Sequence, residues 1–135
     1  MNLPSGTRAL LLMACLLMMS ACAFNVRIMH KSPAQLVPEP PSEQVWTLTT
    51  GTPAILPVGR ATTLKGGTLW RRIGRIEEGD VMRTKDQVVF VEASNSYQAD
   101  IVVRDGKLVG FYLPVDLAFA PCSPPMPIAL TERAN

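Results

Sequence analysis

Hydrophobic and polar residues alternate in short runs through most of the chain, and turn-forming residues separate the runs. Val and Ile dominate these runs, which favours strands over helices. Strands are predicted at residues 45–50, 54–58 and 88–92, and another begins at residue 97. No long amphipathic helical pattern and no internal repeat interrupts this series, so the pattern predicts a mainly β domain.

Two β-hairpins can be assigned a register. Asp105-Gly106 predicts a two-residue turn, because both central positions of that turn type adopt a positive φ. This turn gives three expected cross-strand pairs: Val103 with Leu108, Val102 with Val109, and Ile101 with Gly110. A second turn at Gly66-Gly67 gives two more pairs: Leu64 with Leu69 and Thr63 with Trp70.

The expected fold is a small antiparallel meander of about six or seven strands. It closes as a barrel or folds as a sandwich, and the pattern does not choose between the two. Proline-rich segments flank this β-rich domain, which spans residues 45–120. Residues 22–44 are expected to form an extended tether, because proline fixes φ and removes a backbone donor. Residues 121–135 form a Pro-rich tail, either laid on the domain or free.

The first residues have the pattern of an export signal. Arg8 precedes an uncharged apolar run from Ala9 to Met19. As a helix, this run spans about 16 Å, whereas a bilayer core needs about 20 apolar residues. The run therefore has the length of a signal-peptide apolar region and is too short for a permanent transmembrane helix.

Met19-Ser20-Ala21-Cys22 follows the apolar run. This tetrad resembles the lipobox of bacterial prolipoproteins, and the resemblance covers residues 1–22 only. It implies that residues 1–21 are a lipoprotein signal peptide, and that Cys22 carries a diacylglycerol on its sulfur and an N-acyl chain such as palmitate. Two or three chains hold a protein stably on a membrane. In Gram-negative lipoproteins, an Asp after the lipidated cysteine often retains the protein at the inner membrane. This chain has Ala23 at that position, which favours the inner face of the outer membrane. The alternative is a plain secretory signal with an incidental cysteine.

Composition excludes several classes of function. The net charge is +2, too balanced for bulk nucleic-acid binding. With one His and three Cys in the chain, a zinc site with the usual Cys/His ligand count is hard to assemble. The acids Glu77, Glu78 and Asp80 are too few to surround Ca²⁺. No metal site, no cofactor beyond the acyl groups and no enzymatic activity are expected, since no phosphate-binding glycine loop or hydrolase motif occurs.

Cys122 is the remaining thiol of the mature chain, in an envelope compartment expected to be oxidising. It is a candidate for an intermolecular disulfide, to a second copy or to another envelope protein. The alternative is a small apolar side chain, buried where the tail docks.

Five basic residues form a second candidate site, a run of sixteen positions without an acid: Arg60, Lys65, Arg71, Arg72 and Arg75. This run could contact an anionic partner such as lipid headgroups or an acidic protein surface. The alternative is a set of strand residues that point to water, since Arg71 and Arg72 alternate between faces.

The mature domain carries no motif that assigns it to a family. We expect a membrane-anchored envelope lipoprotein that acts as an interaction or structural accessory subunit of a larger envelope or secretion assembly. A periplasm-facing binder of lipid, envelope polysaccharide or a small anionic molecule is the alternative. A binder needs a cavity lined by aromatic residues, the candidates being Trp46, Trp70, Phe90, Phe111 and Tyr112. An envelope protein partner is expected in the first case, and a homo-oligomer is left open.

Overall fold

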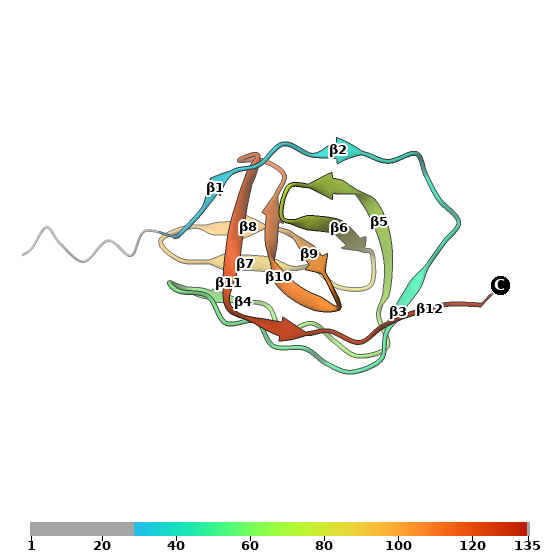
Figure 1. Ribbon diagram of the computed structural model, residues 1–135. Coiled ribbons are helices and arrows are strands. Elements are labelled where there is room, and N and C mark those ends of the chain that lie inside the picture. The colour runs from blue at the N-terminus through green and yellow to red at the C-terminus, as the bar shows by residue number, and fades with distance from the viewer. Residues whose placement is uncertain (1–28, 135) are drawn as a thin grey trace, which may run out of the picture.

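The computed structural model describes residues 29–134, which form twelve strands and no helix (Figure 1). The strands are β1 (Ser32–Pro33), β2 (Val37–Pro38), β3 (Trp46–Leu48), β4 (Arg60–Ala61), β5 (Leu69–Ile76), β6 (Gly79–Thr84), β7 (Phe90–Glu92), β8 (Ser96–Gln98), β9 (Asp100–Arg104), β10 (Lys107–Leu113), β11 (Ala118–Pro127) and β12 (Leu130–Glu132). Every pairing is antiparallel, so the mainly β antiparallel prediction is confirmed.

Nine strands form the larger sheet, in the order β1-β11-β10-β9-β6-β5-β3-β12, with β2 also paired to β5. The other three strands form a small sheet in the order β4-β7-β8. The twelve strands exceed the expected six or seven: β1, β2 and β12 lie in the proline-rich flanks, β11 begins in the predicted domain and ends in its tail, and the domain itself holds the other eight. The chain is also no simple meander, since β6 pairs with β9 while β7 and β8 between them belong to the small sheet.

The Asp105-Gly106 turn is confirmed. Both residues have positive φ, 51° and 72°, and Val103 pairs with Leu108 as predicted. Beyond that pair the predicted register is wrong, because a β-bulge at Val109 shifts it by one residue. Phe111 therefore lies opposite Ile101, and the two side chains are buried in the same hydrophobic cluster. The bulge turns Phe111 to the core face of the sheet.

The predicted Gly66-Gly67 hairpin is wrong. Leu64 forms a bridge with Thr52, and Trp70 pairs with Trp46 of β3 and with Thr84 of β6. The glycines do form a turn, but Gly67 donates its N–H to the carbonyl of Leu48 at 2.7 Å. The strand expected at residues 54–58 is also absent from the described structure, since prolines at 53 and 57 interrupt its donors.

Two hydrophobic clusters lie on opposite faces of the larger sheet. The main cluster contains the largest buried side chains, among them Trp70 and Phe111. The smaller cluster contains Val102, Tyr112 and Phe119, and Leu36 from the N-terminal segment packs against it. The alternation of side chains along β9 and β10 supplies both clusters. The N-terminal segment therefore covers a face of the sheet that is apolar.

Residues 29–44 lie along the domain, whereas the sequence predicts an extended tether that holds the domain away from the membrane. Met29 is buried, β1 pairs with the start of β11, and β2 pairs with the end of β5. Gly74 makes this docking close, because a Cβ at that position would lie 2.4 Å from the carbonyl oxygen of Val37. Pro33 and Pro38 each end a two-residue strand, a place where the sheet tolerates the missing N–H of proline. The segment is extended, as predicted, and packs because it covers apolar surface.

The C-terminal segment is likewise part of the domain. β11 pairs with β10, and the same stretch of chain continues into β12, which pairs with β3. The predicted boundary at residue 121 therefore falls inside a strand. In Figure 1 this segment runs from β11 on one side of the sheet to β12 beside β3 on the other. The C-terminal segment thus connects β10, through β11, to β3, through β12. The N-terminal segment makes a similar connection, since β1 pairs with β11 and β2 pairs with β5.

Candidate functional site

The five basic residues singled out in the sequence occupy separate places. Arg60 lies on β4 of the small sheet, with its Nε 3.1 Å from Oε2 of Glu92. Lys65 lies in the loop before β5, and its side chain is exposed. The other three lie on β5, where Arg71 and Arg75 are exposed and Arg72 is half-buried. The run therefore does not form one basic face.

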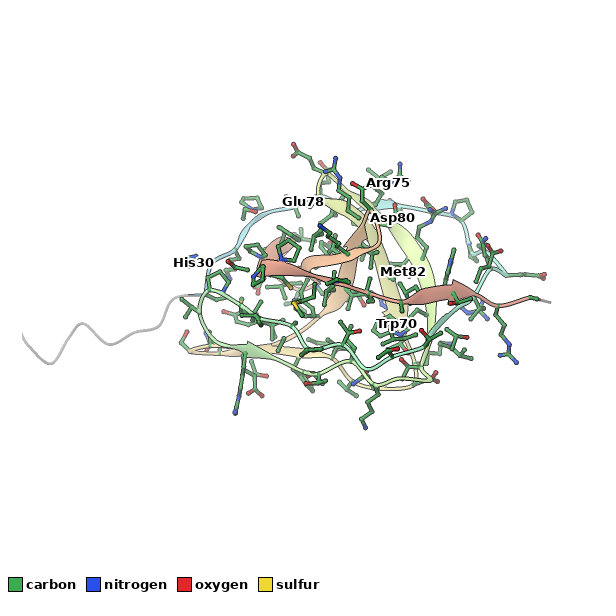
Figure 2. The ribbon with its side chains drawn as sticks, turned by 60° about the horizontal axis from the view of Figure 1, so that its bottom comes forward. His30, Trp70, Arg75, Glu78, Asp80 and Met82 are labelled. Carbon is green, nitrogen blue, oxygen red and sulfur yellow. The ribbon has the colours of Figure 1, made fainter. Side chains whose placement is uncertain are left out.

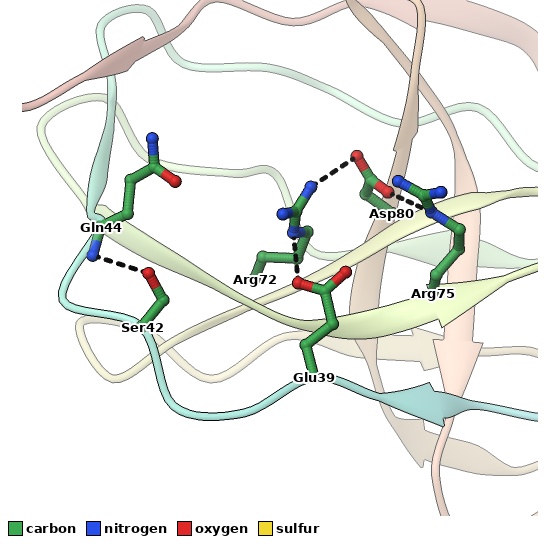
Figure 3. Close-up of polar contacts among 6 residues, drawn as sticks. All are labelled: Glu39, Ser42, Gln44, Arg72, Arg75 and Asp80. Carbon is green, nitrogen blue, oxygen red and sulfur yellow. Dashed lines mark hydrogen bonds and ion pairs between the residues drawn. The ribbon is translucent and has the colours of Figure 1, made fainter.

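Arg72 and Arg75 belong to an ion-pair network (Figure 3). Arg72 Nε donates to Glu39 Oε2 at 2.7 Å, and its Nη1 lies 3.6 Å from Asp80 Oδ2. Arg75 Nε donates to the other oxygen of Asp80 at 2.9 Å. Glu39 comes from the N-terminal segment, so the network fastens that segment to the β5–β6 hairpin. Arg72 and Arg75 thus have acidic partners within the domain.

Arg71 instead joins three cations that the sequence pattern did not single out. They line a surface pocket of about 470 Å³. Its lining residues are Val45, Leu69, Arg71, Ile73, Arg83, Lys85, Asp86 and Arg133. We call this the basic pocket. Four cations surround apolar side chains from β5, so the pocket presents positive charge beside a hydrophobic surface.

Arg71 and Arg83 are directly opposite each other across β5 and β6. Like charges at such a position are destabilising. Arg83 is held by two hydrogen bonds to the buried carboxylate of Asp100, at 2.9 and 2.8 Å. These hydrogen bonds raise the pKa of Arg83 above its ordinary value, so its charge is permanent at any physiological pH. Arg71 is steadied by one hydrogen bond from Nη1 to the carbonyl of Ser42, at 3.0 Å.

The other members of the basic pocket come from the ends of strands. Lys85 and Arg133 are exposed, and they follow β6 and β12 respectively. Asp86 is the one acid in the lining, and its Oδ2 accepts the backbone N–H of Leu69 at 2.7 Å. Arg133 reaches the pocket because its backbone N–H donates to the carbonyl of Val45. Only the folded chain brings residue 133 beside residue 71.

The aromatic residues that would line a ligand cavity do not gather around one. Trp70 and Phe111 fill the main cluster, and Tyr112 belongs to the smaller cluster on the opposite face. Trp70 also satisfies its indole N–H, which donates to Thr68 Oγ1 at 2.9 Å. Phe90 is partly exposed on β7, and Trp46 is half-buried. Figure 2 shows Trp70 within the body of the domain, while Arg75, Glu78 and Asp80 lie together at its surface.

Cys122 is buried in the main cluster. Burial raises the pKa of its thiol to about 11, which keeps the sulfur protonated and unreactive. Ser123 anchors this part of β11, since its N–H donates to the carbonyl of Ile55 at 2.7 Å. The position favours the packing alternative for Cys122 over an intermolecular disulfide.

Two further findings concern residues 29–134. Those residues contain no helix that is long and apolar enough to cross a membrane. They also contain no group of three or more His, Cys, Asp or Glu side chains that could hold a metal ion. Cys22 and the predicted signal peptide, residues 1–21, lie outside the described residues. No protein-family model matches the chain, and neither a curated protein nor a solved structure matches it.

Proposed function

We propose that this chain is a lipid-anchored lipoprotein of the bacterial envelope, on the inner face of the outer membrane, and that it acts as an accessory interaction subunit. The anchor is Cys22, on the strength of the lipobox resemblance at residues 19–22. The basic pocket is the surface that contacts an acidic partner within a larger envelope or secretion assembly. No enzymatic activity is part of this proposal.

The observation that carries the proposal is the basic pocket itself. It gathers Arg71, Arg83, Lys85 and Arg133 around apolar side chains, with Asp86 as the one acid in the lining. Interfaces are built in this way, with an apolar centre and charged groups that select the partner. Of the opposed arginines, Arg83 is compensated by Asp100, whereas Arg71 has a hydrogen bond to the Ser42 carbonyl and no ion pair within the described residues. A carboxylate from a partner would supply that ion pair.

The place of the pocket on the domain supports the same function. Val45 and Arg133 flank β3 and β12, and these strands lie at the end of the domain away from β1 (Figure 1). His30 marks the opposite end in Figure 2. A protein anchored through its N-terminal side would thus present the basic pocket away from its membrane.

The test is co-purification from native membranes in mild detergent. We expect a stoichiometric partner band with the wild-type protein, and its loss when Lys85 and Arg133 are both changed to Glu. These two exposed side chains make no ion pair within the described domain, so the change preserves the fold. Lys107→Glu, an exposed lysine outside the pocket lining, is the matched control and should retain the band.

A clean band of this protein alone in every preparation would contradict the subunit function. The second candidate function would then apply, namely binding of lipid, envelope polysaccharide or a small anionic molecule. The volume of the basic pocket, about 470 Å³, lies within the range of small-molecule sites, and its four cations would suit an anionic ligand. Native mass spectrometry of the detergent-extracted protein would detect such a ligand as an added mass, absent from the Lys85→Glu, Arg133→Glu variant.

A further inference from the structure

We propose that the loop between β10 and β11, residues 114–117, inserts into the surface of the membrane that carries the lipid anchor. This inference rests on the proposed acylation of Cys22. Three features of the described structure lead to it: the place where the N-terminal segment joins the domain, the exposure of two apolar side chains in the loop, and the backbone conformation of Leu117.

The N-terminal segment joins the domain beside this loop. Pro33 of β1 is the register partner of Ala118, and the N–H of Ala34 donates to the carbonyl of Leu117 at 2.9 Å. Lys31 Nζ lies 3.7 Å from Asp116 Oδ2 and 4.9 Å from the centre of the Tyr97 ring. The loop, β1 and β8 therefore lie together at one end of the domain, the end marked by His30 in Figure 2.

The length of chain from the proposed anchor brings that end to the lipid. Met29 is buried in the domain, and Cys22 is seven residues before it. Seven residues span at most about 25 Å when fully extended. A free tether of twenty residues would have let the domain turn in any direction at a distance. Since Met29 is buried against the domain within this reach of Cys22, the end beside β1 is the end held nearest to the bilayer.

The loop presents apolar side chains at that end. Val115 is 88% exposed, the highest value among the large hydrophobic residues of the described chain, and Leu117 is 61% exposed. Apolar groups that enter the headgroup and acyl boundary gain the free energy of leaving water. Asp116, between them, is paired with Lys31, so the loop approaches an anionic lipid surface without an isolated negative charge.

The backbone holds Leu117 in a conformation that does not favour leucine. Its φ is 50°, in the left-handed region where glycine and asparagine are the usual residues. Such strain occurs at functional sites, where a side chain must be held in a given direction. Here the hydrogen bond from Ala34 fixes the Leu117 carbonyl, and the side chain stays in solvent. Contact with a lipid surface explains an apolar residue at this position.

A fluorescent reporter in the loop tests the inference. Val115→Cys is labelled with an environment-sensitive dye in the full acylated protein, which is then reconstituted into vesicles of phosphatidylethanolamine and phosphatidylglycerol. Cys122 is buried, so the label goes to the new thiol. Val88→Cys is the matched control, another exposed valine, two residues from Asp86 of the basic pocket. We expect a blue shift and quenching by nitroxide-labelled lipid at position 115 and neither at position 88.

Mass spectrometry of the same preparation separates the two ways in which the experiment can fail. A protein without acyl groups on Cys22 would overturn the proposed anchor and this inference together. An acylated protein in which the dye at position 115 emits and is quenched as at position 88 would overturn this inference alone. The proposed partner function of the basic pocket would be unaffected by the second outcome.

Discussion

Arg83 and Asp100 form a two-pronged ion pair in which the carboxylate is buried and the guanidinium reaches the surface. Asp100 is also the register partner of Tyr112 on β10, while Arg83 faces Arg71 on β5. The pair thus connects the interior of the sheet to the basic pocket. Because Asp100 compensates the charge of Arg83, the domain can hold Arg71 and Arg83 opposite each other.

Asp100→Asn should therefore weaken the fold. The substitution leaves a buried amide where a carboxylate accepted two charged hydrogen bonds, and it leaves Arg83 with only Arg71 opposite. Removal of one partner from a fully buried pair costs about 3–5 kcal/mol, and the half-exposed guanidinium reduces this to about 2 kcal/mol. The free energy of unfolding in urea measures the loss. Asp105→Asn, at an exposed turn position that accepts asparagine, should change it by less than about 0.5 kcal/mol.

The buried thiol of Cys122 should make stability depend on pH in the alkaline range. Burial raises its pKa from 9.0 to about 11, so between these values the folded chain keeps a proton that the unfolded chain releases. The stabilisation is complete below pH 9 and falls as the pH rises towards 11. Over that range we expect wild type to lose about 1–2 kcal/mol more than Cys122→Ala. Equal pH dependence of the two proteins would contradict a buried thiol.

Gly74→Ala should loosen the N-terminal segment. The added Cβ would lie 2.4 Å from the carbonyl oxygen of Val37, a backbone atom that moves only with the whole of β2. We expect a loss of about 1–3 kcal/mol and faster amide exchange at Glu39, whose N–H donates to Ile73. Gly51→Ala is the matched control, because its Cβ would meet the nearest atom at 3.4 Å, an ordinary contact. Slow exchange at Glu39 in both variants would show that β2 does not depend on Gly74.

Leu117→Asn should stabilise the domain. Asparagine adopts the left-handed conformation at lower cost, and little buried area is lost because the leucine is mostly exposed. The gain should be about 1 kcal/mol, visible as a rise in Tm. Val115→Asn removes a similar apolar side chain two residues earlier, where no positive φ occurs, and should give no gain. If both variants unfold at the wild-type temperature, the strain assigned to Leu117 is wrong.

Features of the fold with purely local causes were predictable, whereas the Gly66-Gly67 hairpin and the strand at residues 54–58 were wrongly predicted from the same local patterns. Short runs rich in Val and Ile predicted strands, and Asp105-Gly106 predicted its turn from the conformations of those two residues alone. The bulge at Val109 was not predictable in this way. It follows from the need to bury Phe111 beside Ile101, which depends on the strands on either side.

The basic pocket shows the same division. A regular hairpin through the turn before Gly79, in which Ile76 pairs with Gly79, would set Arg72 opposite Arg83. A bulge at Ile73 shifts the register so that Arg71 takes that place and Arg72 turns to Glu39. Arg133 joins only because β12 pairs with β3. Neither the bulge at Ile73 nor the pairing of β12 with β3 can be predicted from a short stretch of sequence, because each depends on strands that are distant in the chain.

The sequence by itself determined the β class, the Asp105-Gly106 turn and the motif at Cys22 on which the proposed anchor depends. The tertiary structure decided where the proline-rich flanks go. Their prolines predicted extended chain correctly, but an extended segment is as compatible with a free tether as with an edge strand. Leu36 packs over the apolar face formed by Val102 and Tyr112, so the N-terminal flank docks there. That face exists only once β9 and β10 have paired, because burial of apolar surface between distant segments is a property of the folded chain.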